Sequence, residues 1–243
     1  MTGPELLKAA APDWAACLGD GPAATDWISA PTLPSGAPVP AFVIRVAIDG
    51  GLLFAAERDP GTRLPRWCPE LHVNPDASFC LGRRLYGADD PADVAAFWQA
   101  LGEFLVAQHH VARRGRWPAG RWLSHGEDAA DRQDDAETGA AAAGFAREYA
   151  SCLEFDEGWF AEQARSGRPR VARDAPCPRD CRDDRGRVVR FAHCRHRGAL
   201  QRVVAAERAR RAAQDRYFAA ARRSGRTCCR RVEGCPLAGR MAA

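Results

Sequence analysis

The pattern of apolar and polar positions predicts both strands and helices. Residues 42–48 and 52–56 are rich in β-branched and other apolar residues, and Asp49-Gly50-Gly51 lies between them. Because Asp-Gly between two apolar runs is a strong turn signal, these segments predict a β-hairpin. Residues 57–90 contain several prolines and glycines, so we expect them to be irregular.

Helical periodicity is clearest over residues 91–111. Apolar side chains recur there on one face at the helical spacing: Val94, Phe97, Trp98, Leu101, Phe104 and Leu105. Pro91 fits the first turn of a helix, and either Asp89 or Asp90 is placed to cap it.

The remaining segments give weaker patterns. Apolar spacing predicts further helices over residues 1–20, 138–165 and 200–223. Residues 21–40 hold five prolines and are expected to form a connector, and the acidic residues 126–137 an exposed polar segment.

Composition limits the class of protein. The chain has 243 residues, of which 46% are hydrophobic and 27% charged, as in an ordinary globular protein. No apolar run is long enough to span a membrane, and the N-terminal residues lack the features of a secretory signal. We therefore expect a cytoplasmic protein, whose ten cysteines serve thiol or metal chemistry more than disulfides.

Charge divides the chain near residue 165. Residues 1–165 hold 14 of the 35 Lys and Arg residues and 24 of the 31 Asp and Glu residues, so residues 166–243 are strongly basic. This asymmetry predicts two domains, 1–165 and 166–243. The arginines of the second domain are suited to a nucleic-acid backbone, but neither interleaved aromatic residues nor a DNA-binding motif supports this. We expect them instead to face solvent or the acidic first domain, with an acidic modifier or activating enzyme as a third alternative.

One short segment concentrates groups that can do chemistry. His72, Asn74 and Cys80 lie within nine residues of each other, in the proline-broken loop before the main helix. A cysteine nucleophile needs access and a stabilised thiolate, and an asparagine amide can stabilise an oxyanion. His72 fits a base or a residue that fixes the loop. The alternatives are that Cys80 is a buried core residue or that Cys80 and His72 serve a cysteine hydrolase.

The segment 72–82 resembles the active-site signature of ubiquitin-conjugating enzymes. In that family a His-Pro-Asn triplet precedes the thioester-forming Cys and a Leu. Here His72-Val73-Asn74 has valine in place of proline, and Cys80-Leu81 follows at nearly the family spacing. The order of elements over about residues 1–125 is similar as well. The chain looks most like bacterial conjugating-enzyme-like proteins encoded beside ubiquitin-like modifiers, activating enzymes and deconjugating peptidases, some of which act in antiphage defence.

The resemblance implies an α+β fold, with an antiparallel meander and flanking helices, and a carrier function. Cys80 would accept the C-terminal glycyl group of a ubiquitin-like modifier from an activating enzyme as a thioester, which an amine of a protein acceptor then attacks. Asn74 would bind the oxyanion and His72 would hold the loop. Asp89 or Asp90 would orient the incoming lysine, unless it caps the helix. The alternative function is a non-catalytic adaptor of this fold or a zinc-dependent nucleic-acid-binding protein.

A second segment rich in aromatic residues follows the main helix, from Trp117 to Gly126. Trp117 and Trp122 are expected to anchor the loop on the core. His125 is expected to be a surface or capping residue, and the alternative is that it approaches Cys80.

Metal-ligating residues accumulate towards the C-terminus. The candidate ligands are Cys177, Cys181, Cys194, His196, Cys228, Cys229 and Cys235. This density suits structural zinc, with an iron–sulfur cluster or no metal as alternatives, although the spacing is not that of a standard zinc finger. We expect a small, mainly helical, metal-stapled extension. Cys17, Cys68 and Cys152 are interpreted as core or incidental residues.

Overall fold

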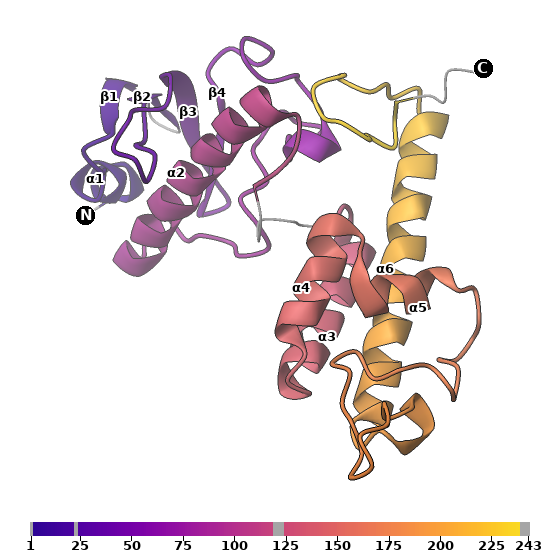
Figure 1. The fold of residues 1–243 in the computed structure, drawn as a ribbon. Coiled ribbons are helices and arrows are strands. Elements are labelled where there is room, and N and C mark those ends of the chain that lie inside the picture. The colour runs from indigo at the N-terminus through magenta and orange to yellow at the C-terminus, as the bar shows by residue number, and fades with distance from the viewer. Residues whose placement is uncertain (1, 22–23, 119–123, 239–243) are drawn as a thin grey trace. The chain divides into compact units, whose positions relative to one another are not determined.

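The computed structural model describes residues 2–21, 24–118 and 124–238. It divides into two compact units (Figure 1). Unit 1 comprises residues 1–118 together with 227–243, and unit 2 comprises residues 119–226. We call residues 227–238 the C-terminal tail. None of the helices in the described ranges is both long and apolar enough to span a membrane.

Unit 1 is an antiparallel meander with two helices. Its four strands follow each other in the sheet in chain order, and each pairs antiparallel with the next. The elements are α1 (Gly3–Ala9), β1 (Ala15–Asp20), β2 (Ala24–Ser29), β3 (Phe42–Asp49), β4 (Leu52–Glu57), the short 3-10 helix η1 (Pro69–Leu71) and α2 (Pro91–Arg114). The expected α+β meander with flanking helices is therefore present.

The predicted hairpin is confirmed. Asp49 pairs with Leu52, which leaves Gly50 and Gly51 as a two-residue turn. Their φ angles are +55° and +80°, a region that residues with a Cβ rarely adopt.

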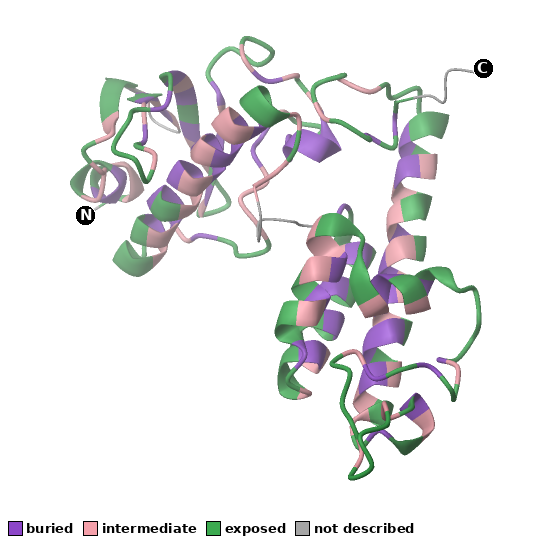
Figure 2. Ribbon diagram, viewed as in Figure 1, coloured by how far each residue is buried: buried purple, intermediate pink, exposed green. Residues whose placement is uncertain are grey.

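The main helix is also confirmed, and it extends the prediction by three residues to Arg114. The Asp90 side chain accepts a hydrogen bond from the backbone N–H of Ala92 over 2.9 Å, so Asp90 is the capping residue. The apolar face of α2 is buried against the sheet and α1 (Figure 2). On that face the Trp98 indole donates to the backbone oxygen of Leu7 over 3.1 Å.

The predictions for residues 1–20 and 21–40 are wrong in part. The helix stops at Ala9, and residues 15–20 form β1. Within the expected connector, residues 24–29 form β2, which pairs with both β1 and β3. The strand is held by its neighbours and by Trp27, which is buried and packs edge-on against Trp98 at 4.8 Å. Such tertiary packing decides the structure of a segment whose own pattern is weak.

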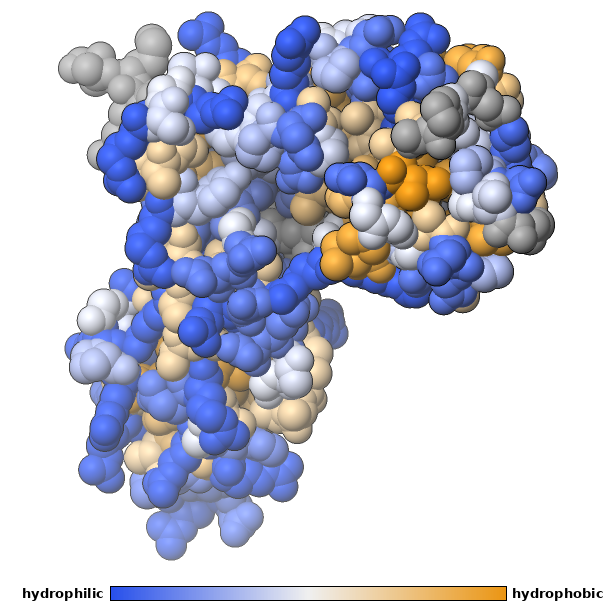
Figure 3. All heavy atoms as spheres, turned by 180° about the vertical axis from the view of Figure 1, so that it is seen from behind, coloured by the Kyte–Doolittle hydropathy of each residue, from blue (hydrophilic) through white to orange (hydrophobic). Residues whose placement is uncertain are grey.

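Hydrophobic residues remain on the surface of unit 1. Leu18, Ile28 and Phe54, which come from three strands, are exposed. In the view from behind, hydrophobic side chains gather on unit 1, whereas the visible face of unit 2 is largely hydrophilic (Figure 3).

Unit 2 is helical. Its elements are α3 (Glu127–Ala142), α4 (Ala146–Phe155), α5 (Gly158–Arg165), the 3-10 helix η2 (Phe191–His193) and α6 (Arg197–Arg223). The long arginine-rich helix is confirmed. The acidic side chains of residues 126–137 are exposed, as expected. The segment is helical, however, and forms most of α3, whose buried face carries the small residues Ala129, Ala136 and Ala140.

The single helix expected over residues 138–165 is wrong. Gly144, Asp156 and Gly158 all have positive φ, at +77°, +53° and +79°, and they separate three helices. Gly144 lies in the first of the two breaks, and the second runs from Asp156 to Gly158, the first residue of α5. Glycine tolerates a positive φ without strain.

A buried ion pair lies in the core of unit 2. The Glu207 side chain is fully buried, and Arg210 donates to its two carboxylate oxygens over 2.7 and 2.8 Å. The Tyr149 hydroxyl donates to the same carboxylate over 2.8 Å. Burial alone raises the pKa of Glu207, but the hydrogen bonds and charge of Arg210, the Tyr149 hydroxyl and the charge of Arg211 together outweigh it, so the pKa is lowered.

The compact units do not follow the boundary expected at residue 165, which falls inside unit 2. Residues 119–226 contain 22 of the 35 Lys and Arg residues and 17 of the 31 Asp and Glu residues. Most of the basic C-terminal part, residues 166–226, therefore belongs to the same unit as the acidic helix α3. The charge asymmetry along the sequence largely cancels within it.

Candidate functional site

Cys80 follows a residue that is fixed to the sheet. The backbone N–H of Phe79 donates to the carbonyl oxygen of Ala55 in β4 over 2.7 Å. The ring of Phe79 stacks on Phe104 of α2 with 4.6 Å between centroids. Contacts with both the sheet and α2 therefore fix the position of the residue before Cys80, although the chain around Cys80 is irregular.

Residues 72–80 form a tight loop above this anchor. Val73 pairs with Phe79, and the backbone N–H of Cys80 donates to the carbonyl oxygen of His72 over 2.8 Å. Cys80 and His72 thus stand opposite each other at the base of the loop. Asn74 lies within the loop, where its backbone N–H donates to the carbonyl oxygen of Ser78 over 2.8 Å.

The side chain of Asn74 is oriented by two residues that sequence reasoning missed. Its amide nitrogen donates to the Ser78 hydroxyl over 3.0 Å, and that hydroxyl donates to the Asp76 carboxylate over 2.7 Å. An amide nitrogen carries two hydrogens, so this bond leaves Asn74 a second one to donate. The sequence indicates this arrangement through Asp76-Ala77-Ser78, a polar segment typical of turns.

Cys80 is half-buried, and its thiol is free. It is therefore neither sealed in the core nor fully exposed. Gly82, two residues later, has φ +111° and no atom within 4 Å of where a Cβ would stand. A φ in this region favours glycine over residues with a side chain.

His72 supports the loop through both its backbone and its side chain. It has a left-handed backbone, with φ 52° and ψ 41°, at the end of η1. Its imidazole is buried and lies edge-on to Trp117, 4.8 Å between centroids. The Trp117 indole in turn donates to the backbone oxygen of Glu70. The expected anchoring by Trp117 is confirmed, whereas Trp122 lies outside the described residues.

Valine makes a contact here that proline cannot make. The backbone N–H of Val73 donates to the carbonyl oxygen of Cys68 over 3.0 Å, and the N–H of Cys68 donates back over 3.1 Å. Proline has no N–H to donate. The departure from the signature therefore adds one hydrogen bond at the base of the loop.

The hairpin, this loop and α2 all lie in a part of the chain that matches a family model. Residues 31–119 match the family model of the prokaryotic E2 domain. This part of the chain is E2-like, and its structure, a four-stranded antiparallel sheet with helices, is consistent with that fold. The family match ends before α3, so it does not cover the helices of unit 2. Comparison with curated proteins and with solved structures gives no match.

Two acidic residues at the start of α2, Asp90 and Asp93, have structural partners. Asp90 caps the helix, as described above. Asp93 pairs with Arg84 over 2.6 Å and accepts from the backbone N–H of Gly87 over 2.9 Å. These bonds fix the segment that leads from the E2-like loop into α2.

His125 is not a surface residue. Only 6% of it is exposed, and its ring packs on Tyr217 and edge-on to Phe218 of α6. It belongs to the core of unit 2, whereas Cys80 belongs to unit 1.

The seven predicted metal ligands are divided between the units. Cys177, Cys181, Cys194 and His196 lie in unit 2, where Cys181 is hydrogen-bonded to Cys177 and interacts with the charge of Cys194. The Nε2 atom of His196 accepts from Arg195 over 2.9 Å. Throughout the residues that the structure describes, no three His, Cys, Asp or Glu side chains surround a common point as metal ligands do.

The other three predicted ligands, Cys228, Cys229 and Cys235, lie in the C-terminal tail of unit 1. There the Cys229 sulfur is 3.0 Å from that of Cys68. This hydrogen bond lowers the pKa of Cys229 to about 6 and, together with burial, raises that of Cys68. Cys68 is buried in the core as expected, but it is not incidental.

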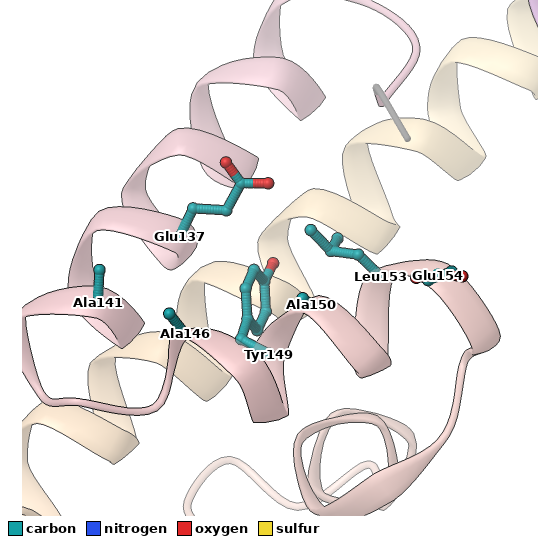
Figure 4. Close-up of a pocket in the computed structure, with 7 residues that line it drawn as sticks. All are labelled: Glu137, Ala141, Ala146, Tyr149, Ala150, Leu153 and Glu154. Atoms are coloured by element: carbon teal, nitrogen blue, oxygen red, sulfur yellow. The ribbon is translucent and has the colours of Figure 1, made fainter. Parts of the chain in front are cut away.

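A separate pocket of about 310 Å³ lies on unit 2 (Figure 4). It is lined from α3 and α4, with the carboxylate of Glu137 on one side and Tyr149 and Leu153 on the other. The Tyr149 hydroxyl is already bonded to Glu207. None of the predicted site residues lines this pocket.

Proposed function

We propose that the protein carries a ubiquitin-like modifier as a thioester on Cys80 and passes it to an amine. The observation that carries this proposal is the placement of a half-buried, free thiol on a loop that also fixes an asparagine amide. The loop lies within the part of the chain that matches the prokaryotic E2 domain. The proposed partners are the modifier, an activating enzyme and a protein acceptor.

Two acyl transfers make up the reaction. First, the Cys80 thiolate attacks the carbonyl carbon of the modifier's activated C-terminal glycine, and the sulfur of the activating enzyme leaves as a thiolate. Second, the acceptor amine attacks the new thioester, and the tetrahedral intermediate collapses with Cys80 as the leaving thiolate. The amine loses a proton to solvent, and an amide bond remains.

Asn74 serves the second transfer. Negative charge develops on the carbonyl oxygen as the amine attacks, and a fixed amide donor stabilises it. Ser78 and Asp76 hold the Asn74 amide in place before the reaction begins, which lowers the reorganisation that the step requires. His72, which is buried against Trp117, acts as a support of the loop rather than as a base.

A charging assay with the activating enzyme, the modifier and ATP tests this function. The wild-type chain should form an adduct that a reducing thiol reverses. Cys80→Ser should form an oxygen ester that resists the thiol, and Cys80→Ala should form none. Cys17→Ala is the matched control, because Cys17 is exposed and distant in the chain from the loop. A folded Cys80→Ala variant that charges like the wild type would overturn the proposal.

A further inference from the structure

Two thiols that are far apart in the sequence lie in contact in unit 1. The sulfurs of Cys68 and Cys229 are 3.0 Å apart, although 161 positions separate the two residues in the chain. Cys68 precedes η1, and Cys229 lies in the C-terminal tail, which returns to unit 1 after α6 (Figure 1). Both thiols are free. Since both residues belong to unit 1, the contact lies within one compact unit.

Other contacts of the tail hold it at this place. Cys229 itself packs against the apolar core of unit 1. The backbone N–H of Glu233 donates to the carbonyl oxygen of Gly115, at the end of α2, over 2.8 Å. The side chain of Arg231 donates to the backbone oxygen of Arg63. The meeting of the two sulfurs is therefore part of a docked tail and does not depend on the sulfurs alone.

The two sulfurs differ in their access to solvent. Cys68 is only 2% exposed, whereas Cys229 is half-buried. A small oxidant from solvent therefore meets Cys229 first. Cys68, in contact with it, is placed to react with the oxidised product. An accessible thiol beside a second, resolving thiol is the arrangement found in redox-sensitive cysteine pairs.

We propose that Cys68 and Cys229 form a redox pair that a peroxide oxidises to a reversible disulfide. The Cys229 thiolate attacks one oxygen of hydrogen peroxide, the O–O bond breaks, and the other oxygen leaves as hydroxide, which takes up the proton that the thiol lost. The sulfur of Cys68 then attacks the sulfenic acid on Cys229, the S–O bond breaks, and water leaves with the Cys68 proton. Two electrons pass from the two sulfurs to the peroxide. A dithiol reduces the bond again and becomes a disulfide itself.

Little movement is needed to form this bond. The sulfurs of a disulfide are about 2.05 Å apart, so the pair approaches by about 1 Å from its present 3.0 Å. The neighbouring sulfur, that of Cys228, accepts a hydrogen bond from the backbone N–H of Arg230 over 3.2 Å, within the tail. The geometry therefore favours Cys229 over Cys228 as the partner of Cys68.

Oxidation would tie the tail to the base of the E2-like loop. Cys68 exchanges two backbone hydrogen bonds with Val73, and Val73 pairs with Phe79, the residue before Cys80. The new bond would also close a long covalent loop in the chain, which restricts the unfolded state and so stabilises the folded one. Cys80 is not a member of the pair, so the inference does not depend on the proposed function.

Peroxide treatment of the reduced full chain tests the pair. The protein is reduced, desalted, exposed to hydrogen peroxide and then alkylated. The closed loop should make the denatured chain migrate faster on a non-reducing gel, and dithiothreitol should reverse the shift. Cys68→Ala and Cys229→Ala should each abolish the shift, whereas the matched controls Cys228→Ala and Cys80→Ala should retain it.

Peptide mapping of the oxidised wild-type chain gives a second readout, so that poor folding of a variant does not decide the result. Trypsin should release Cys68 in residues 67–83 and Cys229 in residues 227–230, joined by one disulfide that fragmentation places between these two cysteines. The proposal is overturned if the folded, peroxide-treated chain yields the two peptides unlinked. A bond that uses the other cysteine of either peptide would also overturn it.

Urea unfolding tests whether the disulfide stabilises unit 1. The oxidised wild-type chain should unfold at a higher urea concentration than the reduced chain, because the closed loop restricts the unfolded state. Cys229→Ala should unfold at the same concentration with and without peroxide. Equal midpoints for the oxidised and reduced wild-type chains would contradict the proposed attachment of the tail.

Discussion

The backbone N–H of Cys80 donates to the carbonyl oxygen of His72 over 2.8 Å, so the two ends of the signature meet at the base of one loop. This contact gives His72 a structural function that requires no proton transfer by its imidazole. A left-handed backbone at His72, φ 52°, aims its carbonyl at Cys80, while its buried ring holds that conformation against Trp117. The Cys80 backbone is thereby fixed on the same loop that carries Asn74.

Ser78→Ala should slow transfer to amines while sparing formation of the thioester. The variant removes the hydroxyl that holds the Asn74 amide, and a lost hydrogen bond of about 1 kcal/mol corresponds to a rate loss of about fivefold. Asn74→Ala, which removes the donor itself, should lose about 10²–10³-fold in the same step. Single-turnover discharge to free lysine measures the two rates.

The control for this series is Asp76→Asn, which retains an oxygen to accept from Ser78. It should discharge at nearly the wild-type rate. Equal losses in charging and discharge for Asn74→Ala would contradict the oxyanion role.

Val73→Pro restores the triplet of the conjugating-enzyme signature, and we expect it to destabilise unit 1. Proline removes the N–H that Val73 donates to Cys68, at a cost of about 1–3 kcal/mol. Urea unfolding measures the change. Val73→Ala is the comparison, because it retains the N–H but loses more side-chain volume. A Val73→Pro variant as stable as the wild type would show that the bond contributes nothing.

Glu207→Gln should destabilise unit 2 by about 3–5 kcal/mol, because it leaves the buried Arg210 without its charge partner. Urea unfolding at neutral pH measures this loss. The surface pair of Asp128 with Arg216, 3.7 Å apart and largely exposed, provides the control. Asp128→Asn should cost less than about 1 kcal/mol.

The same pair predicts a dependence on pH. The pKa of Glu207 in the folded chain is lowered from its ordinary value of 4.5. The contribution of the ionised Glu207 carboxylate to the free energy of unfolding is therefore complete above pH 4.5. It is lost as the pH falls through the lowered pKa. The difference in stability between wild type and Glu207→Gln should shrink in acid. A difference that stays constant down to the acid unfolding of the chain would contradict the assignment.

The sequence predicts a helix or strand when the contacts that determine that element are close together in the chain. The helix α2 and the β3–β4 hairpin follow from periodicity, a cap and one turn, so residues 91–111 and 42–56 predict them directly. The strand β2 does not, because its place is decided by pairing with β1 and β3 on both sides. Gly144 and Asp156 similarly break a helix whose apolar pattern continues through them.

The site divides in the same way. His72, Asn74 and Cys80 lie in one short segment, so their association can be read from spacing. The contact of Cys68 with Cys229 joins residues 161 positions apart, and no local pattern indicates it. The orientation of Asn74 by Ser78 also depends on a turn geometry that the residue types alone do not fix.

Peptide mapping of the charged protein tests the central claim most directly. After a single round of charging, the adduct is trapped under non-reducing conditions and its position is read by mass spectrometry. We predict that the C-terminal glycine of the modifier is attached to the sulfur of Cys80 and to no other cysteine. Attachment to a different cysteine, or to none while the activating enzyme itself is charged, would contradict the carrier role.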